Sequence, residues 1–276
     1  MIEKILLADS GTGHTEEMLK ALMEIPSLKP ASVTVLHVVS PQVTSDGMTA
    51  KWEEGGKILA TAIQSLQLDP NHVNAMLRQG DPKSIVCEVA DEIDADLIIM
   101  GSRGLKRLES ILENSVSQYV FQLSARPMLL VKDDIYVKKI SKIMVAMDGS
   151  EASKETLKLA LSLLRDIKGG QLILVRINPK VESSSPETNP VLAPAVAEAK
   201  KMGVAYRCII GTGKPGEEIC RIAEEVGTDL LMLGSPDRRP SIAKGLPDLD
   251  RLLGTSLSDY VRVYANCPVL LARTVG

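Results

Sequence analysis

An internal duplication with a period near 140 residues constrains the fold of this chain more than any other feature. KILLADS at residues 4–10 returns as KIMVAMDGS at 142–150, and matching Asp148 to Asp9 places the two copies 139 residues apart. DLIIMGSRG (96–104) returns as DLLMLGSPD (229–237), and SQYVFQLSARPMLLV (117–131) returns as SDYVRVYANCPVLLA (258–272). Solenoid repeats are shorter, at about 20–50 residues. Each copy is therefore expected to be a domain with its own core, at residues 1–135 and 136–276.

The composition fits a folded protein without a nucleic-acid or membrane partner. The 276 residues are 45% hydrophobic and carry a net charge of −3, and only 3% are aromatic, so neither charge nor base stacking favours nucleic acid. No apolar stretch approaches the about 18 residues of a spanning helix, and Asp9 interrupts any signal-peptide core. We therefore expect a cytoplasmic protein. Its cysteines, Cys87, Cys208, Cys220 and Cys267, are isolated and predict neither a metal site nor a disulfide scaffold.

Within each copy, short β-branched runs alternate with stretches of helical period, which is typical of βαβ units. In the first copy we expect strands at 5–8, 33–39, 73–79, 97–100 and 128–131, and helices at 15–22, 51–68, 82–93 and 114–125. Asp81 and Pro82 suit the N-cap and first position of the third helix. With right-handed crossovers, each copy becomes a Rossmann-like, doubly wound α/β domain. Its five-stranded parallel sheet has the order 3-2-1-4-5, with helices on both faces.

Ligands of such sheets bind beyond the carboxyl ends of the strands, where the winding direction reverses. In the first copy this place lies between the segment after Ala8 and the segment after Met100, which read ADSGTG (8–13) and GSRG (101–104). Any strand-ending turn favours Gly and Ser, so one such loop alone is ambiguous. The prediction of a binding site depends on the two loops together.

The two loops suggest a nucleotide. Gly101 and Gly104 let the backbone approach a ligand and offer N–H groups to phosphate oxygens, and Arg103 adds a cation. Asn114 and Ser115 come ten residues later, at the start of a helix whose amino end favours an anion. Asp9 would repel a triphosphate in the absence of a metal ion. We therefore expect its carboxylate to accept hydrogen bonds from an adenine amino group or a ribose hydroxyl.

This combination resembles the universal stress protein family, whose pattern is an Asp after strand 1 and G-x2-G-x9-G-[ST] after strand 4. The first copy has Asp9, GSRG at 101–104, nine residues, and then Asn114 and Ser115, with Asn in place of the family's Gly. Neither copy carries a Walker or dinucleotide-binding motif. The resemblance covers the whole chain twice and implies a tandem, ATP-binding stress-response protein, with or without Mg²⁺. It places the nucleotide at Ala8, Asp9, Ser10, Val38, Met100, Gly101, Arg103, Gly104, Asn114, Ser115, Val116 and Ser117.

The second copy departs from the pattern. Asp148 stands in the family-like phrase MDGS, and Gly234 begins the loop, but Asp237 replaces the second Gly. The next helix is expected to start at Ser256, with 17 residues where the pattern has nine between Asp237 and Thr255. The insertion at 238–247 either supplies other phosphate contacts or fills the site. We therefore expect the nucleotide chiefly in the first copy, and assign Asp148, Gly234 and Ser256 as the corresponding positions.

Two alternatives stay open at this stage. The first alternative is a nucleotide-free scaffold with degenerate pockets. The second is a slow ATPase or nucleotidyl transferase. No dedicated catalyst is evident, since only Asp9, Ser10 and His14 lie near the expected pocket. The Ser-, Pro- and Gly-containing segment at 40–56 is either a lid or a plain loop. The resemblance also implies that the two copies pair along their fifth strands within one chain, and a homodimer is a further option.

Overall fold

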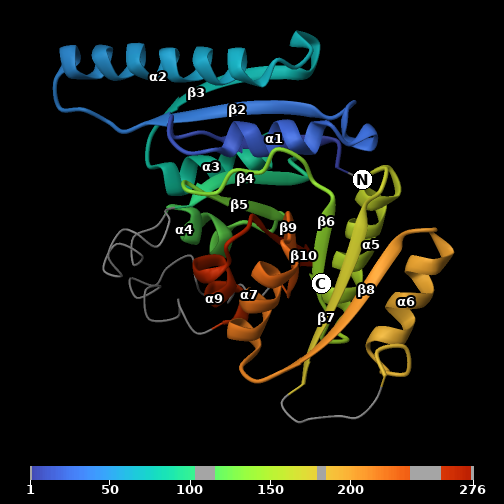
Figure 1. The fold of residues 1–276 in the computed structure, drawn as a ribbon. Helices are drawn as coiled ribbons and strands as arrows, with labels where there is room; N and C mark the ends of the chain where they lie inside the picture. The colour runs from blue at the N-terminus through green and yellow to red at the C-terminus, as the bar shows by residue number, and fades with distance from the viewer. Residues whose placement is uncertain (1, 103–115, 179–184, 237–255, 275–276) are drawn as a thin grey trace. The chain divides into compact units, whose positions relative to one another are not determined.

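A computed structural model describes residues 2–102, 116–178, 185–236 and 256–274 of the chain. The main division falls between Lys138 and Lys139 and separates two compact units, called unit 1 and unit 2 below. Each unit is a five-stranded parallel sheet with helices packed against it (Figure 1). The predicted fold class is therefore confirmed.

Unit 1 has the predicted sheet order, β3-β2-β1-β4-β5. The crossovers from β1 to β3 run in one direction and the crossover to β4 runs in the other, so the helices divide between the two faces. Helices α1 and α2 pack with each other on one face, and α3 and α4 pack with each other on the opposite face. The elements are β1 (Lys4–Ala8), α1 (Thr15–Met23), the 3₁₀ helix η1 (Pro26–Leu28), β2 (Ser32–Val39), α2 (Ser45–Leu66), η2 (Pro70–His72), β3 (Val73–Gln79), α3 (Pro82–Glu92), β4 (Leu97–Ser102), α4 (Val116–Leu123) and β5 (Met128–Lys132).

Capping side chains explain where two of these helices begin. Asp81 caps α3 as predicted, with its carboxylate accepting from the Lys83 amide at 3.2 Å and Pro82 in the first turn. Thr44 caps α2, because its hydroxyl accepts from the Gly47 amide at 3.2 Å. Helix α2 therefore starts six residues earlier than the predicted position 51. The prediction of a loop or lid over 40–56 was wrong for most of that segment, because α2 begins directly after its N-cap Thr44. The glycines of this segment had favoured a loop, but they lie within the helix.

Unit 2 repeats the same architecture in the order β8-β7-β6-β9-β10. Ser150 caps its first helix and Ser256 caps its last, each accepting at 3.2 Å from a backbone amide three residues on. The expected helix start at Ser256 is thus confirmed. The elements are β6 (Lys142–Ala146), α5 (Glu151–Arg165), β7 (Gln171–Asn178), α6 (Leu192–Lys201), β8 (Ala205–Thr212), α7 (Pro215–Val226), β9 (Leu230–Pro236), α9 (Leu257–Tyr264) and β10 (Val269–Thr274).

The strand register corrects one prediction about the duplication. Ala8 pairs with Leu36 and Met100 in unit 1, and Ala146 pairs with Val175 and Leu233 in unit 2. These pairs make Ala146 the counterpart of Ala8, so Met147 is the counterpart of Asp9.

Hydrogen bonds at the ends of these strands agree with this register. The amide of Asp9 donates to Leu36 O at 2.9 Å, and the amide of Met147 donates to Val175 O at 2.8 Å. Matching Asp148 to Asp9 was therefore wrong by one residue, because the aspartate follows its strand directly in unit 1 and one position later in unit 2.

No helix in the described part of the chain is both long enough and apolar enough to cross a membrane.

Candidate functional site

A cavity of about 390 Å³ opens at the carboxyl ends of the central strands of unit 1. Its floor and walls come from the ends of β1, β2 and β4, and from the first turns of α3 and α4. Eight of the predicted site residues line it together: Ala8, Asp9, Ser10, Val38, Met100, Gly101, Val116 and Ser117. The four others, Arg103, Gly104, Asn114 and Ser115, lie outside the described residues. The eight described candidates therefore lie together at the place that the switch-point rule predicts.

Asp9 is the most unusual group in this cavity. It is 5% exposed, and its Oδ1 accepts a hydrogen bond from the Gly11 amide at 2.8 Å. Its Oδ2 is buried without a hydrogen-bond partner. Burial raises the pKa of this carboxyl above its ordinary value, although the Gly11 bond and His37 act in the opposite direction. A buried acceptor left open in a cavity costs free energy unless a ligand donates to it.

Sequence reasoning missed several residues of the cavity. Ser102 is 8% exposed, and its hydroxyl is a second buried polar atom of the cavity without a partner. His37 donates from Nδ1 to the Asp9 carbonyl oxygen at 2.8 Å and so supports the backbone at the end of β1. Asp133 follows β5 and reaches the same edge. The meeting of parallel strand ends at one edge was a signal that predicts Ser102 and Asp133. The remaining missed residues are Thr12, Leu36, Pro82 and Val86.

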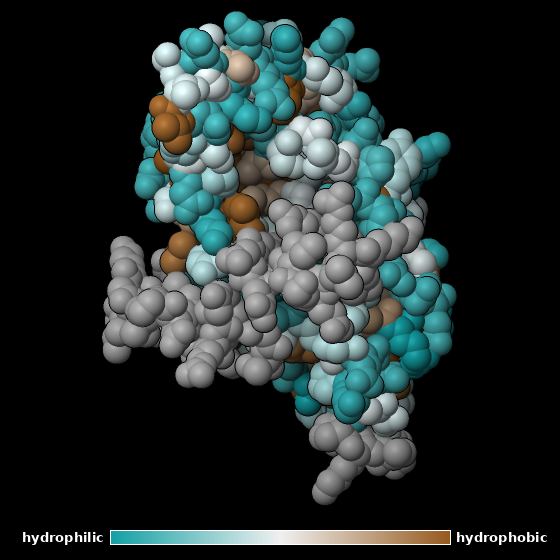
Figure 2. Space-filling model, turned by 90° about the vertical axis from the view of Figure 1, so that its left-hand side faces the viewer, coloured by the Kyte–Doolittle hydropathy of each residue, from teal (hydrophilic) through white to brown (hydrophobic). Residues whose placement is uncertain are grey.

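Figure 2 shows one face of the molecule, turned by 90° from the view of Figure 1. In Figure 2 most of the described surface on that face is hydrophilic, and apolar atoms occupy small areas, some of them recessed in a hollow.

The first turn of α1 determines the room beside Gly101. Ala8 and Ala146 are equivalent in the strand register, so counting onward from them makes Thr15 equivalent to Ser153. The first residue of α5, Glu151, is then equivalent to Gly13. Gly13 has a φ of +93°, which cannot continue a right-handed helix, and α1 begins only at Thr15. A Cβ placed on Gly101 would lie 3.7 Å from the nearest atom of Thr15, an ordinary contact. The late helix start thus leaves space at the end of β4.

The equivalent cavity in unit 2 is smaller, at about 150 Å³. Helix α5 begins earlier and presses on the end of β9, since a Cβ on Gly234 would lie 2.4 Å from the Ala152 carbonyl carbon. Arg176 stands where unit 1 has His37 and donates from its guanidinium to the Met147 carbonyl oxygen at 3.3 Å. The larger side chain lines the cavity. Both differences reduce the volume available to a ligand.

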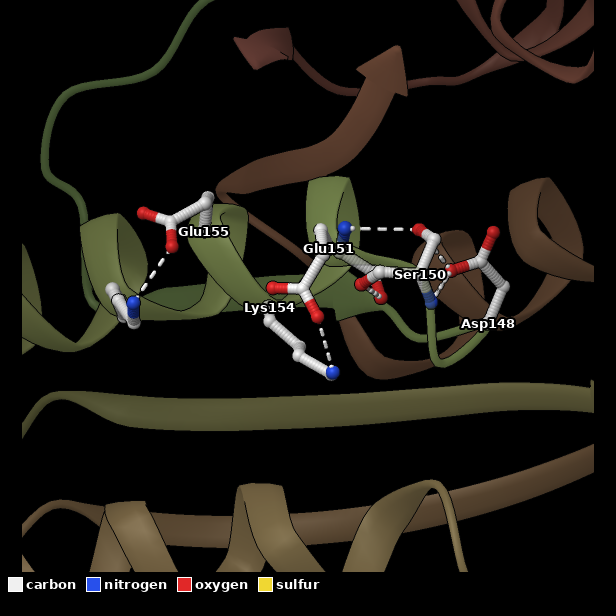
Figure 3. Close-up of polar contacts among 7 residues, drawn as sticks. Asp148, Ser150, Glu151, Lys154 and Glu155 are labelled. Carbon is white, nitrogen blue, oxygen red and sulfur yellow. Dashed lines mark hydrogen bonds and ion pairs between the residues drawn. The ribbon is translucent and has the colours of Figure 1, made fainter. Parts of the chain in front are cut away.

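Asp148 is placed differently from Asp9. It is exposed, and its Oδ1 accepts from the hydroxyl and the amide of Ser150 at 2.6 and 2.9 Å (Figure 3). Burial raises its pKa, but these hydrogen bonds outweigh burial and leave the pKa below its ordinary value. Asp148 and Gly234 line the cavity of unit 2, whereas Ser256 caps α9 and is not one of the lining residues. The aspartate of unit 2 therefore belongs to a helix-capping network.

Fold and site together define a class of protein: a duplicated, doubly wound α/β protein with a ligand cavity at the switch point of its first unit. The profile of the Universal stress protein family matches residues 1–132 and again residues 139–273. The chain belongs to the universal stress protein family.

The chain is similar to one curated protein and to two solved structures. A universal stress protein from Synechocystis sp. is 44% identical over 135 residues, which cover 48% of this chain and 86% of that protein. A universal stress protein structure from Archaeoglobus fulgidus covers 98% of this chain and 96% of that one, with a TM-score of 0.74 at 19% identity. A family protein from Arabidopsis thaliana, solved with AMP bound, covers 49% of this chain and 93% of that one, with a TM-score of 0.37 at 23% identity.

Proposed function

We propose that the chain binds an adenine nucleotide in unit 1 and acts as a stress-response regulatory protein whose contacts change with occupancy. The observation that carries the proposal is the buried Oδ2 of Asp9, which lacks a partner and belongs to a residue lining a cavity of about 390 Å³. Ligand sites for small molecules typically begin at about 300 Å³. The cavity thus has the size for a nucleoside and a buried acceptor for one of its donors.

The described walls suit the two ends of a nucleotide differently. Apolar atoms of Ala8, Val38 and Met100 offer contact to a base, and Asp9 offers an acceptor to an amino group or a ribose hydroxyl. Val116 and Ser117 begin α4, where the positive end of the helix dipole favours phosphate oxygens. The family resemblance adds Arg103, Gly104, Asn114 and Ser115 to the phosphate end. ATP, with Mg²⁺ as a companion ion, is our proposed full ligand.

Unit 1 is the proposed working site. Unit 2 offers less than half of the cavity volume, and its Arg176 and the start of α5 occupy the corresponding space. Its predicted residues, Asp148, Gly234 and Ser256, are therefore not assigned to nucleotide in this proposal. The cytoplasmic location and the pairing of the two units through their fifth strands stay predictions.

A pair of matched variants tests the proposal. Val38→Trp fills the cavity of unit 1, and Ile177→Trp makes the same change at the equivalent position of unit 2. In calorimetric titrations, adenosine and ATP with Mg²⁺ should bind the parent chain and Ile177→Trp with similar affinity. Binding to Val38→Trp should weaken by at least about tenfold, which corresponds to about 1.4 kcal/mol. Circular dichroism melting checks that both variants are folded.

The outcomes separate the competing functions. Absence of heat with every adenine ligand in the parent chain would overturn nucleotide binding and favour a scaffold that acts through its surfaces. Greater loss in Ile177→Trp than in Val38→Trp would move the site to unit 2. Rapid release of phosphate from ATP by the parent chain, lost in Val38→Trp, would favour the ATPase.

A further inference from the structure

Asp133 brings a second carboxylate to the cavity of unit 1. It directly follows β5, and its amide donates to the Ser102 carbonyl oxygen at 3.2 Å, which ties it to the end of β4. A Cβ placed on Gly13 would lie 2.9 Å from Asp133 Oδ1, and one placed on Gly101 would lie 3.8 Å from the same atom. The carboxylate therefore lies between the loop that precedes α1 and the end of β4, and the glycine at 13 makes that approach possible.

The described wall of this cavity is negatively charged. Asp9 and Asp133 are both lining residues, and no Lys or Arg is found among the described residues that line the cavity. The negative charge also affects nearby Glu16. The pKa of Glu16 is raised, first by burial and second by the charge of Asp9. Asp9 lies at the end of β1, whereas Asp133 lies beside Gly101, on the side where β4 ends and α4 begins. A phosphate chain on that side of the cavity would meet the Asp133 carboxylate.

A divalent cation resolves this conflict. Mg²⁺ is commonly held by one or two carboxylates together with substrate phosphates rather than by a cage made of protein groups alone. Among the described residues, no group of three or more His, Cys, Asp or Glu is placed to hold a metal ion. A cation at Asp133 therefore needs the oxygens of the nucleotide as its other ligands.

We infer that Asp133 is a selectivity residue of unit 1, which makes binding of the phosphate chain dependent on a divalent cation and leaves nucleoside binding unaffected. This inference rests on the proposed nucleotide site. Without the cation, Asp133 repels the phosphates; with it, Asp133 is one of the groups that hold the metal–phosphate complex. Free ATP is then a poor ligand, and the complex of ATP with Mg²⁺ is a good one.

Titrations of the full chain test this inference, with Asp134→Asn as the matched control. Asp134 is the neighbouring exposed residue and does not line the cavity, so the control removes the same charge from outside it. The parent chain and Asp134→Asn should bind ATP more tightly with Mg²⁺ than with a chelator. In Asp133→Asn, affinity for ATP without Mg²⁺ should rise by about three- to tenfold, and the gain on adding Mg²⁺ should shrink.

Adenosine serves as the internal check, because it carries no phosphate. Its affinity should be equal in all three proteins, which also shows that the variants are folded. Equal responses of Asp133→Asn and Asp134→Asn to Mg²⁺ would overturn the role of Asp133 while leaving the nucleotide site intact. Absence of adenosine and ATP binding in the parent chain would instead overturn the proposed function, and this inference would fall with it.

Discussion

The buried carboxylate of Asp9 destabilises the fold and offers a ligand a hydrogen-bond acceptor. Its Oδ1 holds the turn at Gly11, and its Oδ2 is buried without a partner. Burial raises its pKa above the ordinary value of 3.8, so the folded chain holds the proton more tightly than the unfolded chain does. The free energy of unfolding therefore falls as the pH rises from 3.8 through the raised pKa. Wherever Asp9 is ionised, its buried charge lowers the free energy of unfolding.

We accordingly predict that Asp9→Asn stabilises the ligand-free chain at pH 7, by about 1 kcal/mol, because a neutral amide costs less to bury than a carboxylate. The Asn carbonyl oxygen can still accept from Gly11, so the turn is kept. The stabilisation should shrink as the pH falls toward 3.8, where Asp9 itself becomes protonated. Urea unfolding at several pH values measures this. The same variant should bind adenosine more weakly.

A stability gain that does not change with pH would contradict the assignment of the cost to the charge of Asp9. Asp148→Asn is the comparison in unit 2. Hydrogen bonds keep the pKa of Asp148 below its ordinary value, so its charge stabilises the fold at neutral pH and the substitution should be destabilising.

Gly101 and Gly234 are equivalent in sequence but differ in their surroundings. Gly101 has room for a Cβ, at 3.7 Å from Thr15, whereas a Cβ on Gly234 would enter the backbone of Ala152 at 2.4 Å. A bulky residue at Gly234 therefore disturbs the packing of α5 on β9 before it affects any ligand. The effect on ligand affinity cannot be separated from damage to the fold at that position.

At the scale of elements, the segment between the first strand and the first helix distinguishes the two units. Residues 9–15 of unit 1 and 147–153 of unit 2 have equal length and equivalent ends. In unit 1 the segment is a loop, and in unit 2 its second half is already helix α5, capped by Ser150. The first helix of unit 2 thus begins about one short turn earlier than that of unit 1, and the cavity volume is about 150 Å³ in unit 2 against about 390 Å³ in unit 1.

Exchange of this segment tests its effect on the cavity. We predict that replacing residues 10–15 with the sequence of 148–153, with Asp9 retained, starts α1 earlier and abolishes adenosine binding. The fold should survive, because Gly101, like Gly234, has no side chain, so an earlier α1 can approach the end of β4 as closely as α5 approaches the end of β9. Calorimetry and thermal melting measure the two effects. Undiminished adenosine binding in this exchange variant would show that the helix start does not control the cavity.

At the scale of the whole molecule, the duplication and the alternation of strands and helices were sufficient to predict the class of fold and the strand order. They also brought eight site residues to one cavity, because the switch-point rule depends only on strand order. The start of α2 at Thr44 and the register of Asp9 against Met147 were not predictable, because both depend on local hydrogen bonds that repetition conceals. Asp133 was missed because it lies about 120 residues from Asp9 in sequence and meets it only at the sheet edge. The domain limits at 1–135 and 136–276 stay a proposal.

The two units should respond differently to the same ligand. A ligand that binds the folded state at 100 times its Kd stabilises that state by about 2.7 kcal/mol, which slows hydrogen exchange through unfolding by about a hundredfold. With saturating adenosine, we predict slower exchange in β1 and β4 of unit 1 and unchanged exchange in β6 and β9 of unit 2. Exchange followed by mass spectrometry on the full chain measures both. Val38→Trp should show no change in either unit, since its cavity is filled. Equal slowing in β9 would mean that unit 2 binds adenosine or shares the stabilisation, and would contradict a single working site.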